Sequence, residues 1–309
     1  MFRHILKRLA VSIILILGVF VLTFMLMQFV PGNPFYSERS TPEQIQYAKE
    51  KYDLDKPLLI QLKTYFVNYL KGDLGVSLKM QEGMPVSDIL FHQGKFVTSI
   101  KLGLLSLLVA VLFGVPLGVL AAMKDKLWLD NILRTFTSIC TSTPTFVLSA
   151  LLVYIFSVKL RWLPSISGNL DSIESLVLPV ICLSNFYFCY IYKLTKSSMT
   201  DVMKMDYIVT AKAKGLSKRR ILYKHALFNA LTPIITYIGP ATVGLITGSF
   251  VVESIFSVPG MGRYFIQSIL SRDYPIIMAT TIIYSVLIAL SNLVIDIIYR
   301  LIDPRVSFK

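Results

Sequence analysis

Charged residues are scarce in this sequence. Of its 309 residues only 16% are Asp, Glu, Lys or Arg, whereas 54% belong to the apolar set and the mean hydropathy is +0.64. Soluble domains carry about 25% charged residues, so the composition excludes an ordinary soluble domain and predicts a membrane-embedded chain. Acidic residues are rarer than basic ones, and the net charge is +13. The bases lie between apolar blocks and form no single stripe, which argues against nucleic-acid binding.

Groups that carry chemistry are also few. Cys140, Cys182 and Cys189 lie inside apolar runs, and an odd number cannot pair completely, so we expect them to be packing residues. The three histidines are far apart in the sequence, and no cluster has the spacing of a metal site. No G-x-x-x-x-G-K-[ST] motif occurs, so the chain lacks the loop that holds nucleotide phosphates. We therefore expect no catalytic residue, no metal and no cofactor in this chain.

Six apolar segments are long enough to cross a bilayer. A hydrocarbon layer about 30 Å thick needs roughly 20 helical residues, and six long stretches contain no Asp, Glu, Lys or Arg. Strands of a β-barrel would instead have about 10 residues with strict alternation. The sequence therefore predicts an all-α membrane protein with six transmembrane helices, at residues 9–30, 102–123, 135–158, 175–192, 225–252 and 274–295.

The distribution of basic residues predicts the orientation. If the amino terminus is cytoplasmic, the cytoplasmic segments hold 18 of the 31 bases but six of the 18 acids; they are 1–8, 124–134, 193–224 and 296–309. Basic residues are retained on the cytoplasmic side of membranes. We therefore expect both termini in the cytoplasm. The first span is expected to remain as an uncleaved anchor, because its apolar stretch is too long for a signal peptide.

The segment 31–96, between the first two spans, has helix signals of its own. Thr41, Pro42 and Gln44 have the form of a capping box with proline at the first helical position, which predicts a short helix through about Lys51. A second amphipathic helix is predicted from Pro57 to about Gly72; it is too short to span, and its apolar face consists of Leu58, Leu62, Tyr65, Phe66 and Tyr69. A small folded cap and a contact surface for an external partner are compatible interpretations.

The basic segment 193–224 is too long for a simple turn. Gly215 follows an alanine-rich stretch and suits a left-handed helix stop, and Ser217 has the position of a cap for the next helix. This predicts a short helix that projects into the cytoplasm between two spans. Ala211 and Ala213 are expected to be low-profile positions where another protein approaches closely.

The same segment resembles a known family. The residues that carry the likeness are Asp206, Tyr207, Thr210 to Ser217, His225 to Leu227, Asn229 to Leu231 and Pro233. They are similar to the cytoplasmic signature of ABC-importer permeases, and within these to the first membrane subunit of oligopeptide and dipeptide permeases. The wider family has Glu-Ala-Ala six residues before the glycine, where this chain has Val209, Thr210 and Ala211. The peptide branch commonly has Thr-Ala there, so the departure favours the narrower assignment.

Further motifs extend this resemblance along nearly the whole chain. They are Pro31-Gly32-Asn33-Pro34, Gly72-Asp73-Leu74-Gly75 with Ser77, Gly114-Val115-Pro116-Leu117-Gly118, Pro259-Gly260, Arg272-Asp273-Tyr274-Pro275 and Asp303-Pro304-Arg305. Each motif is weak evidence alone, but their order and spacing together are specific.

The resemblance implies a type I ABC-importer permease fold with six transmembrane helices and an extracytoplasmic helical insertion after helix 1. It divides the chain into 1–30 (cytoplasmic amino terminus and first span), 31–96 (helical insertion) and 97–309 (core permease). A coupling segment at about 201–217 would seat on an ATPase; its site residues would be Asp206, Tyr207, Thr210, Ala211, Ala213, Gly215, Leu216 and Ser217.

The resemblance also implies partners. These are a second homologous permease, two ATPase subunits that bind ATP and Mg, an extracytoplasmic substrate-binding protein and a peptide substrate, in the plasma membrane of a bacterium or archaeon. Glu253 stands where the fifth span ends, and it either packs at the helix end or contacts the delivered substrate or its binding protein.

Alternative functions remain open within and outside this family. An importer of the same build for nickel, a metallophore, glutathione or another small solute would share the scaffold. A secondary transporter or channel is disfavoured because the central parts of the second, third and fifth spans contain no ionisable residue. An intramembrane enzyme is disfavoured because no nucleophile and base, and no carboxylate pair, can be identified in the spans.

Overall fold

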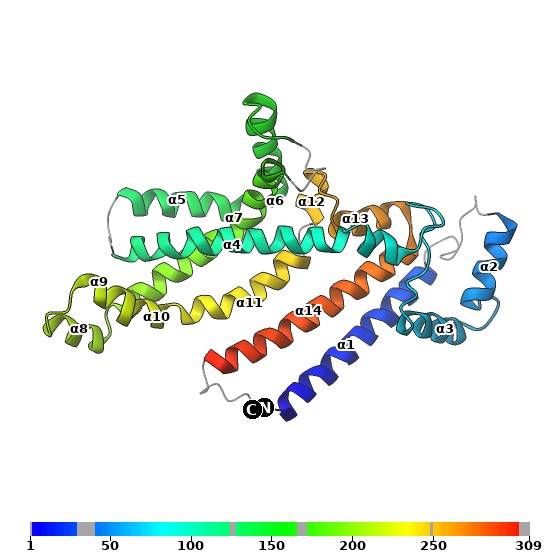
Figure 1. The fold of residues 1–309 in the computed structure, drawn as a ribbon, viewed down its shortest axis with the longest axis horizontal. Coiled ribbons are helices and arrows are strands. Elements are labelled where there is room, and N and C mark those ends of the chain that lie inside the picture. Colours follow the sequence, from blue (N-terminus) through cyan, green and yellow to red (C-terminus); the bar gives the residue numbers. More distant parts are fainter. Residues whose placement is uncertain (1, 30–40, 124–127, 166–171, 248–249, 303–309) are drawn as a thin grey trace. The chain divides into compact units, whose positions relative to one another are not determined.

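The computed structural model describes residues 2–29, 41–123, 128–165, 172–247 and 250–302 (Figure 1). Within these ranges the chain is helical and contains no strand, so the predicted all-α class is confirmed. The α-helices are α1 (Phe2–Phe29), α2 (Pro42–Tyr52), α3 (Leu58–Leu70), α4 (Lys95–Met123), α5 (Trp128–Ser142), α6 (Thr145–Leu152), α7 (Ile173–Val202), α8 (Asp206–Ala213), α9 (Lys218–Arg220), α10 (Leu227–Ala230), α11 (Thr232–Thr247), α12 (Phe250–Ile255), α13 (Met261–Ser271) and α14 (Tyr274–Ile302). The wider-turn π-helical segments are η1 (Asp88–His92), η2 (Val153–Lys159) and η3 (Ile221–Ala226).

Five helical segments in the described ranges are long and apolar enough to cross a membrane. They are Leu6–Phe29, Lys95–Met123, Ile173–Val202, Thr232–Ile255 and Tyr274–Ile297. The predicted span at 135–158 is not one straight helix, because Asp130–Ser142 and Thr145–Lys159 meet at an angle of 110°. Pro144 at the break has an extended ψ of 141°, so the backbone leaves the helical conformation there. Because proline has no N–H, it also cannot donate a hydrogen bond that would continue the preceding helix. The chain therefore has six apolar crossings only if this bent pair counts as one.

The predicted fifth span begins later than the sequence indicated. Residues 225–230 belong to η3 and α10, and the next long helix starts at Thr232. Pro233 explains the new start, because proline is favoured at the first helical positions, where its missing N–H has no partner to lose. The residues from His225 to Leu231 carry no charge, but they do not belong to the long helix α11 that follows them.

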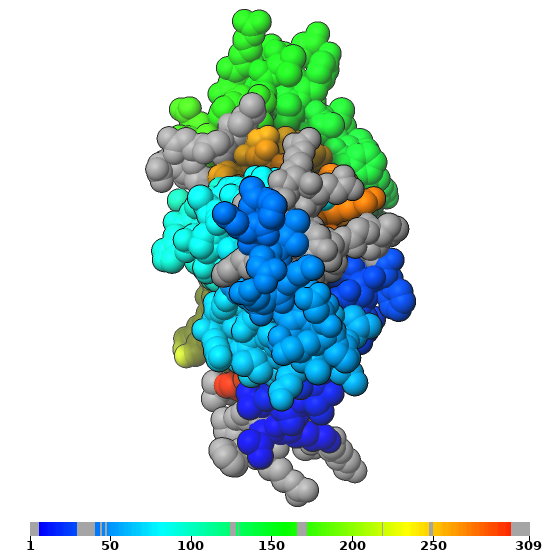
Figure 2. Space-filling model, turned by 90° about the vertical axis from the view of Figure 1, so that its right-hand side faces the viewer, coloured from blue at the N-terminus to red at the C-terminus, as the bar shows by residue number. Residues whose placement is uncertain are grey.

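Contacts divide the chain into two units, of which the first comprises residues 1–99 and 259–293. Its aromatic core joins α1, α2, α3 and α14 through buried residues that include Phe24, Tyr52, Tyr65 and Met278. Figure 2 shows the lighter blue surface of α2 and α3 beside the darker blue of α1. The two helices predicted in the insertion are confirmed as α2 and α3, although Leu58 in the first turn of α3 is exposed and not part of the packed face.

A buried carboxylate holds the first unit together near α14. Asp273 is fully buried, and its oxygens accept hydrogen bonds from the Ser77 hydroxyl (2.6 Å) and from the backbone N–H groups of Leu78, Lys79 and Met80 (3.0–3.2 Å). Clustered backbone donors form a natural anion-binding turn. Two motifs far apart in sequence, around Ser77 and around Asp273, are therefore parts of one clamp.

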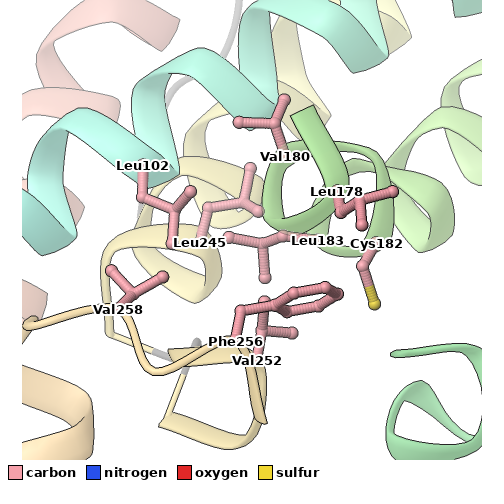
Figure 3. Packing of buried hydrophobic residues seen from close by; sticks show 9 residues of the cluster. All are labelled: Leu102, Leu178, Val180, Cys182, Leu183, Leu245, Val252, Phe256 and Val258. Carbon is pink, nitrogen blue, oxygen red and sulfur yellow. The ribbon is translucent and has the colours of Figure 1, made fainter. Parts of the chain in front are cut away.

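The second unit comprises residues 100–258 and 294–309. One of its cores, drawn in Figure 3, joins α4, α7, α11 and α12 through Leu102, Leu183, Leu245 and Val252. This contact-based division differs from the division at residue 97 inferred from the sequence, because residues 259–293 group with the first unit.

Glycines allow α4 and α7 to cross closely within the second unit. A Cβ at Gly118 would lie 2.6 Å from Cβ of Thr195 and 2.8 Å from the Tyr192 carbonyl oxygen, and a Cβ at Gly114 would lie 3.0 Å from Ile191. The two glycines are four residues apart, which is the spacing that brings membrane helices together. Because both glycines lie against α7, the motif Gly114-Val115-Pro116-Leu117-Gly118 in the second span is a packing surface.

Candidate functional site

The candidate site is α8 and the turn that follows it. Figure 1 shows α8 beyond the carboxyl end of α7 and before α9. The helix ends in a Schellman motif: the Leu216 N–H donates to the Ala211 carbonyl (3.3 Å) and the Gly215 N–H donates to the Lys212 carbonyl (3.0 Å). Gly215 has φ +72°, so the predicted left-handed stop is confirmed.

Packing fixes which face of α8 points outward. Ile208 is fully buried and Ala211 is 6% exposed, and both belong to a core that also contains Met199, Ile221 and Leu222, with Leu216 packed against it. Ala211 therefore faces its own chain in this conformation, whereas the sequence predicted a position that another protein approaches closely. The small side chain is needed for internal packing at the helix end.

The opposite face of α8 is open. Its exposed residues are Asp206, Tyr207, Val209, Thr210 and Ala213, and Gly215 and Ser217 continue the exposed surface past the helix end. Tyr207 and Val209 are 43% and 56% exposed. Ala213 is exposed beside them, and its role as a low-profile contact position stays a prediction.

Hydrogen bonds connect this surface to the helices that follow. Ser217 caps the next helical segment, since its Oγ accepts the Arg220 N–H (3.4 Å). The Tyr207 hydroxyl accepts a hydrogen bond from Nδ2 of Asn229 (2.9 Å), which lies on α10. Tyr207 and the packed core therefore connect α8 with α10 and α7.

Some contributors to the site were not recognised from the sequence. Ile208 anchors α8 but was not singled out; its apolar side chain three residues before Ala211 was the available signal. Asn229 was noted only as part of a motif, and its partner Tyr207 lies 22 residues away, so local spacing could not reveal the bond.

Glu253 lies apart from α8. It belongs to α12, and its side chain is 1% exposed. This burial favours the interpretation of Glu253 as a residue that packs at the helix end.

The described residues show no arrangement typical of a metal centre. No group of three His, Cys, Asp or Glu side chains in those ranges is placed to hold an ion. What the site offers is a shaped protein surface held by a helix cap and a core.

Comparison with solved structures defines the class of protein. The chain resembles the MetNI methionine ABC transporter in its inward-facing form (TM-score 0.56, 17% identity, 68% of this chain and 94% of that chain). It also resembles an amino acid ABC transporter solved with histidines (TM-score 0.52, 17% identity, 68% and 94%). The fold is that of a type I ABC-importer permease, in a multi-pass membrane protein.

Sequence comparison shows the family. Residues 114–308 match the family model "Binding-protein-dependent transport system inner membrane component", and residues 1–103 match its amino-terminal companion. The chain belongs to this family of transport-system permeases. It is 41% identical to the oligopeptide transport system permease OppB of Haemophilus influenzae over all of both chains, and 41% identical to the dipeptide transport system permease DppB of Bacillus subtilis over 99% of this chain and 98% of that protein.

Proposed function

We propose that this chain is a membrane-spanning permease subunit of an ATP-driven importer of oligopeptides or dipeptides. The observation that carries the proposal is the full-length similarity to OppB and DppB, whose names specify peptide transport. Nickel, metallophore and glutathione importers share the scaffold, but the relatives described above favour peptides. The chain would form one half of a pathway that a second homologous permease completes.

The energy for transport would come from other subunits. The sequence has no nucleotide-phosphate loop, so ATP and Mg would be bound by two partner ATPases, and this chain would be non-catalytic and hold no cofactor. An extracytoplasmic binding protein would deliver the peptide. The membrane would be the plasma membrane of a bacterium or archaeon, with both termini of this chain in the cytoplasm and the helical insertion outside.

The outer face of α8 would seat on one ATPase. Tyr207, Val209 and Ala213 present the contact surface, while buried Ile208 and Ala211 hold the helix against α7 and η3. Because the helix is fixed by its core, movement of the ATPase would move the membrane helices and not only a flexible loop.

Substitution of Ala213 tests the coupling. In the reconstituted complex, Ala213→Arg should reduce binding-protein-stimulated ATP hydrolysis and peptide uptake by about tenfold or more, because overpacking a close interface costs about 1–3 kcal/mol. Ala213→Ser at the same position keeps the low profile and should leave both activities near the wild-type value. Normal uptake by the arginine variant, in a complex that still contains both ATPases, would contradict the docking role.

A further inference from the structure

A pocket with mostly apolar walls and charged groups among its lining residues lies between α5 and α7 in the second unit. Its volume is about 380 Å³, and its lining includes Arg134 and Thr137 of α5 together with Tyr192, Lys193, Lys196 and Asp201 of α7. The two helices pack against each other. In the proposed orientation the pocket is at the cytoplasmic end of both helices.

The exposed surface of α5 has two different sides. An apolar side carries Trp128, Ile132, Phe136 and Ile139, which are 48–71% exposed. A polar side carries the exposed residues Asn131, Arg134, Ser138 and Ser142, which recur at helical spacing. Arg134 belongs to both the polar side and the pocket, so the pocket opens beside the polar side and not beside the apolar one.

This arrangement indicates what faces each side. Lipid tails suit the apolar side, whereas a guanidinium and an amide are costly in hydrocarbon. Polar groups in membrane helices face the interior of an assembly or a water-filled cavity. In the proposed orientation Arg134 and Lys193 lie in the cytoplasmic segments 124–134 and 193–224, so the polar side of α5 and the pocket face water or protein at the inner end of the transporter.

One carboxylate neutralises part of the positive charge at the pocket. Asp130 has a side chain 4% exposed; it accepts hydrogen bonds from Nζ of Lys196 (2.5 Å) and the Tyr192 hydroxyl (3.3 Å), and an Arg134 guanidinium nitrogen lies 3.5 Å from its second oxygen. Lys196 is thus committed to a buried ion pair that fixes α5 against α7. Its role is structural.

Lys193 is in a different position. Its side chain is exposed at the pocket, and within the described parts of the chain no carboxylate oxygen lies within 4 Å of its ammonium. Among the residues that the structure describes at this pocket, three bases (Arg134, Lys193 and Lys196) stand beside two carboxylates (Asp130 and Asp201), so the bases outnumber the acids by one there. The Thr137 hydroxyl at the same pocket donates its hydrogen bond to the Arg134 carbonyl oxygen of its own helix (3.1 Å), so the bases Arg134 and Lys193 are the donors that remain for a ligand.

We infer that Lys193, supported by Arg134, binds the carboxylate of a peptide on the cytoplasmic half of the pathway. This inference rests on the proposed function and names the part of the substrate that this chain recognises. The guanidinium of Arg134 and the ammonium of Lys193, which meet at this pocket, complement the one negative group that every unmodified peptide carries at its carboxyl end. A site at the inner end would hold the peptide after the outer gate has closed and before its release.

The test uses the complete transporter in sealed vesicles, with the binding protein outside and ATP enclosed. Trialanine or its carboxyl-terminal amide is also enclosed, so that the binding protein never meets it, and uptake of external radiolabelled trialanine is measured. Enclosed trialanine should inhibit uptake at a concentration about tenfold lower than the amide, the difference expected for one charge-assisted hydrogen bond. In Lys193→Gln this difference should vanish, whereas Lys193→Arg should retain it.

Lys63→Gln is the matched control, because Lys63 is an exposed lysine on α3, remote in sequence and outside the pocket. It should behave as the wild type does. Equal inhibition by trialanine and its amide in the wild type, or an unchanged difference in Lys193→Gln, would overturn the carboxylate site. Two other results would also overturn it. If Lys193→Gln preparations lose the second permease, Lys193 makes a subunit contact. If the effect of Lys193→Gln depends on phosphatidylglycerol in the vesicles, the pocket is a lipid site. Failure of the proposed function is a separate result: the wild type would then show no ATP-dependent uptake of trialanine.

Discussion

Gly215 shows how one residue can be required for its backbone alone. A Cβ at this position would meet nothing within 4 Å, yet φ is +72°. Side chains disfavour this left-handed conformation by about 1–2 kcal/mol, and asparagine tolerates it best. We therefore expect Gly215→Val to insert normally but to lose ATPase docking, because the Schellman turn and the end of α8 are displaced.

Gly215→Asn is the control for this prediction. It should retain most of the binding-protein-stimulated ATP hydrolysis, and both variants should be present in the membrane at similar amounts. The measurement is ATPase co-purification with the tagged permease. Full co-purification with Gly215→Val would show that the turn is not needed for docking.

Asp273 is the residue on which the clamp of the first unit depends. Its carboxylate accepts four hydrogen bonds from the Ser77–Met80 turn. Asp273→Asn replaces one acceptor oxygen by a donor, so a buried N–H would face other donors, at a cost of about 1–3 kcal/mol. We expect a lower midpoint of thermal unfolding in detergent, whereas Asp55→Asn, at a side chain 78% exposed, should leave the midpoint unchanged. Equal midpoints for both variants would refute the clamp.

At the scale of elements, the crossing of α4 and α7 depends on glycine. Gly118→Val would place a branched side chain where even a Cβ lies 2.6 Å from Thr195. We expect much less monodisperse protein after solubilisation, because the helices must separate. Gly18→Val is the matched control, since a Cβ at Gly18 of α1 meets nothing within 4 Å. Size-exclusion profiles of the two variants make the comparison, and similar profiles would mean that the crossing is not a critical contact.

The helices themselves were largely predictable, but their breaks were not. Charge-free stretches identified the apolar segments, and capping signals identified α2 and α3 correctly. The 110° bend between α5 and α6 escaped prediction because an uninterrupted apolar run has the same composition whether it is straight or bent. The sequence shows Pro144 within this apolar run, but a proline in a membrane helix is compatible with a simple kink as well as with a sharp break.

At the scale of the whole molecule, the asymmetry of basic residues gives a prediction about topology. In a variant whose three cysteines are replaced by serine, a cysteine at Leu70 (72% exposed, in α3) should react with a membrane-impermeant maleimide in intact cells. A cysteine at Lys224, which is exposed in η3, should react only after the membrane is opened. The opposite pattern would reverse the proposed orientation, because the basic segment 193–224 would then be outside.

The sequence alone determined the class of protein, since apolar length, charge position and the order of short motifs are local properties of the chain. It also located the segment 201–217 and the left-handed stop at Gly215. Only the tertiary structure decided that Ala211 faces inward and Ala213 outward, that Asp273 binds the turn at Ser77, and that Lys196 is paired with Asp130 while Lys193 is not. These outcomes depend on contacts between residues distant in sequence, and the burial and pairing that such contacts create are not encoded in local spacing.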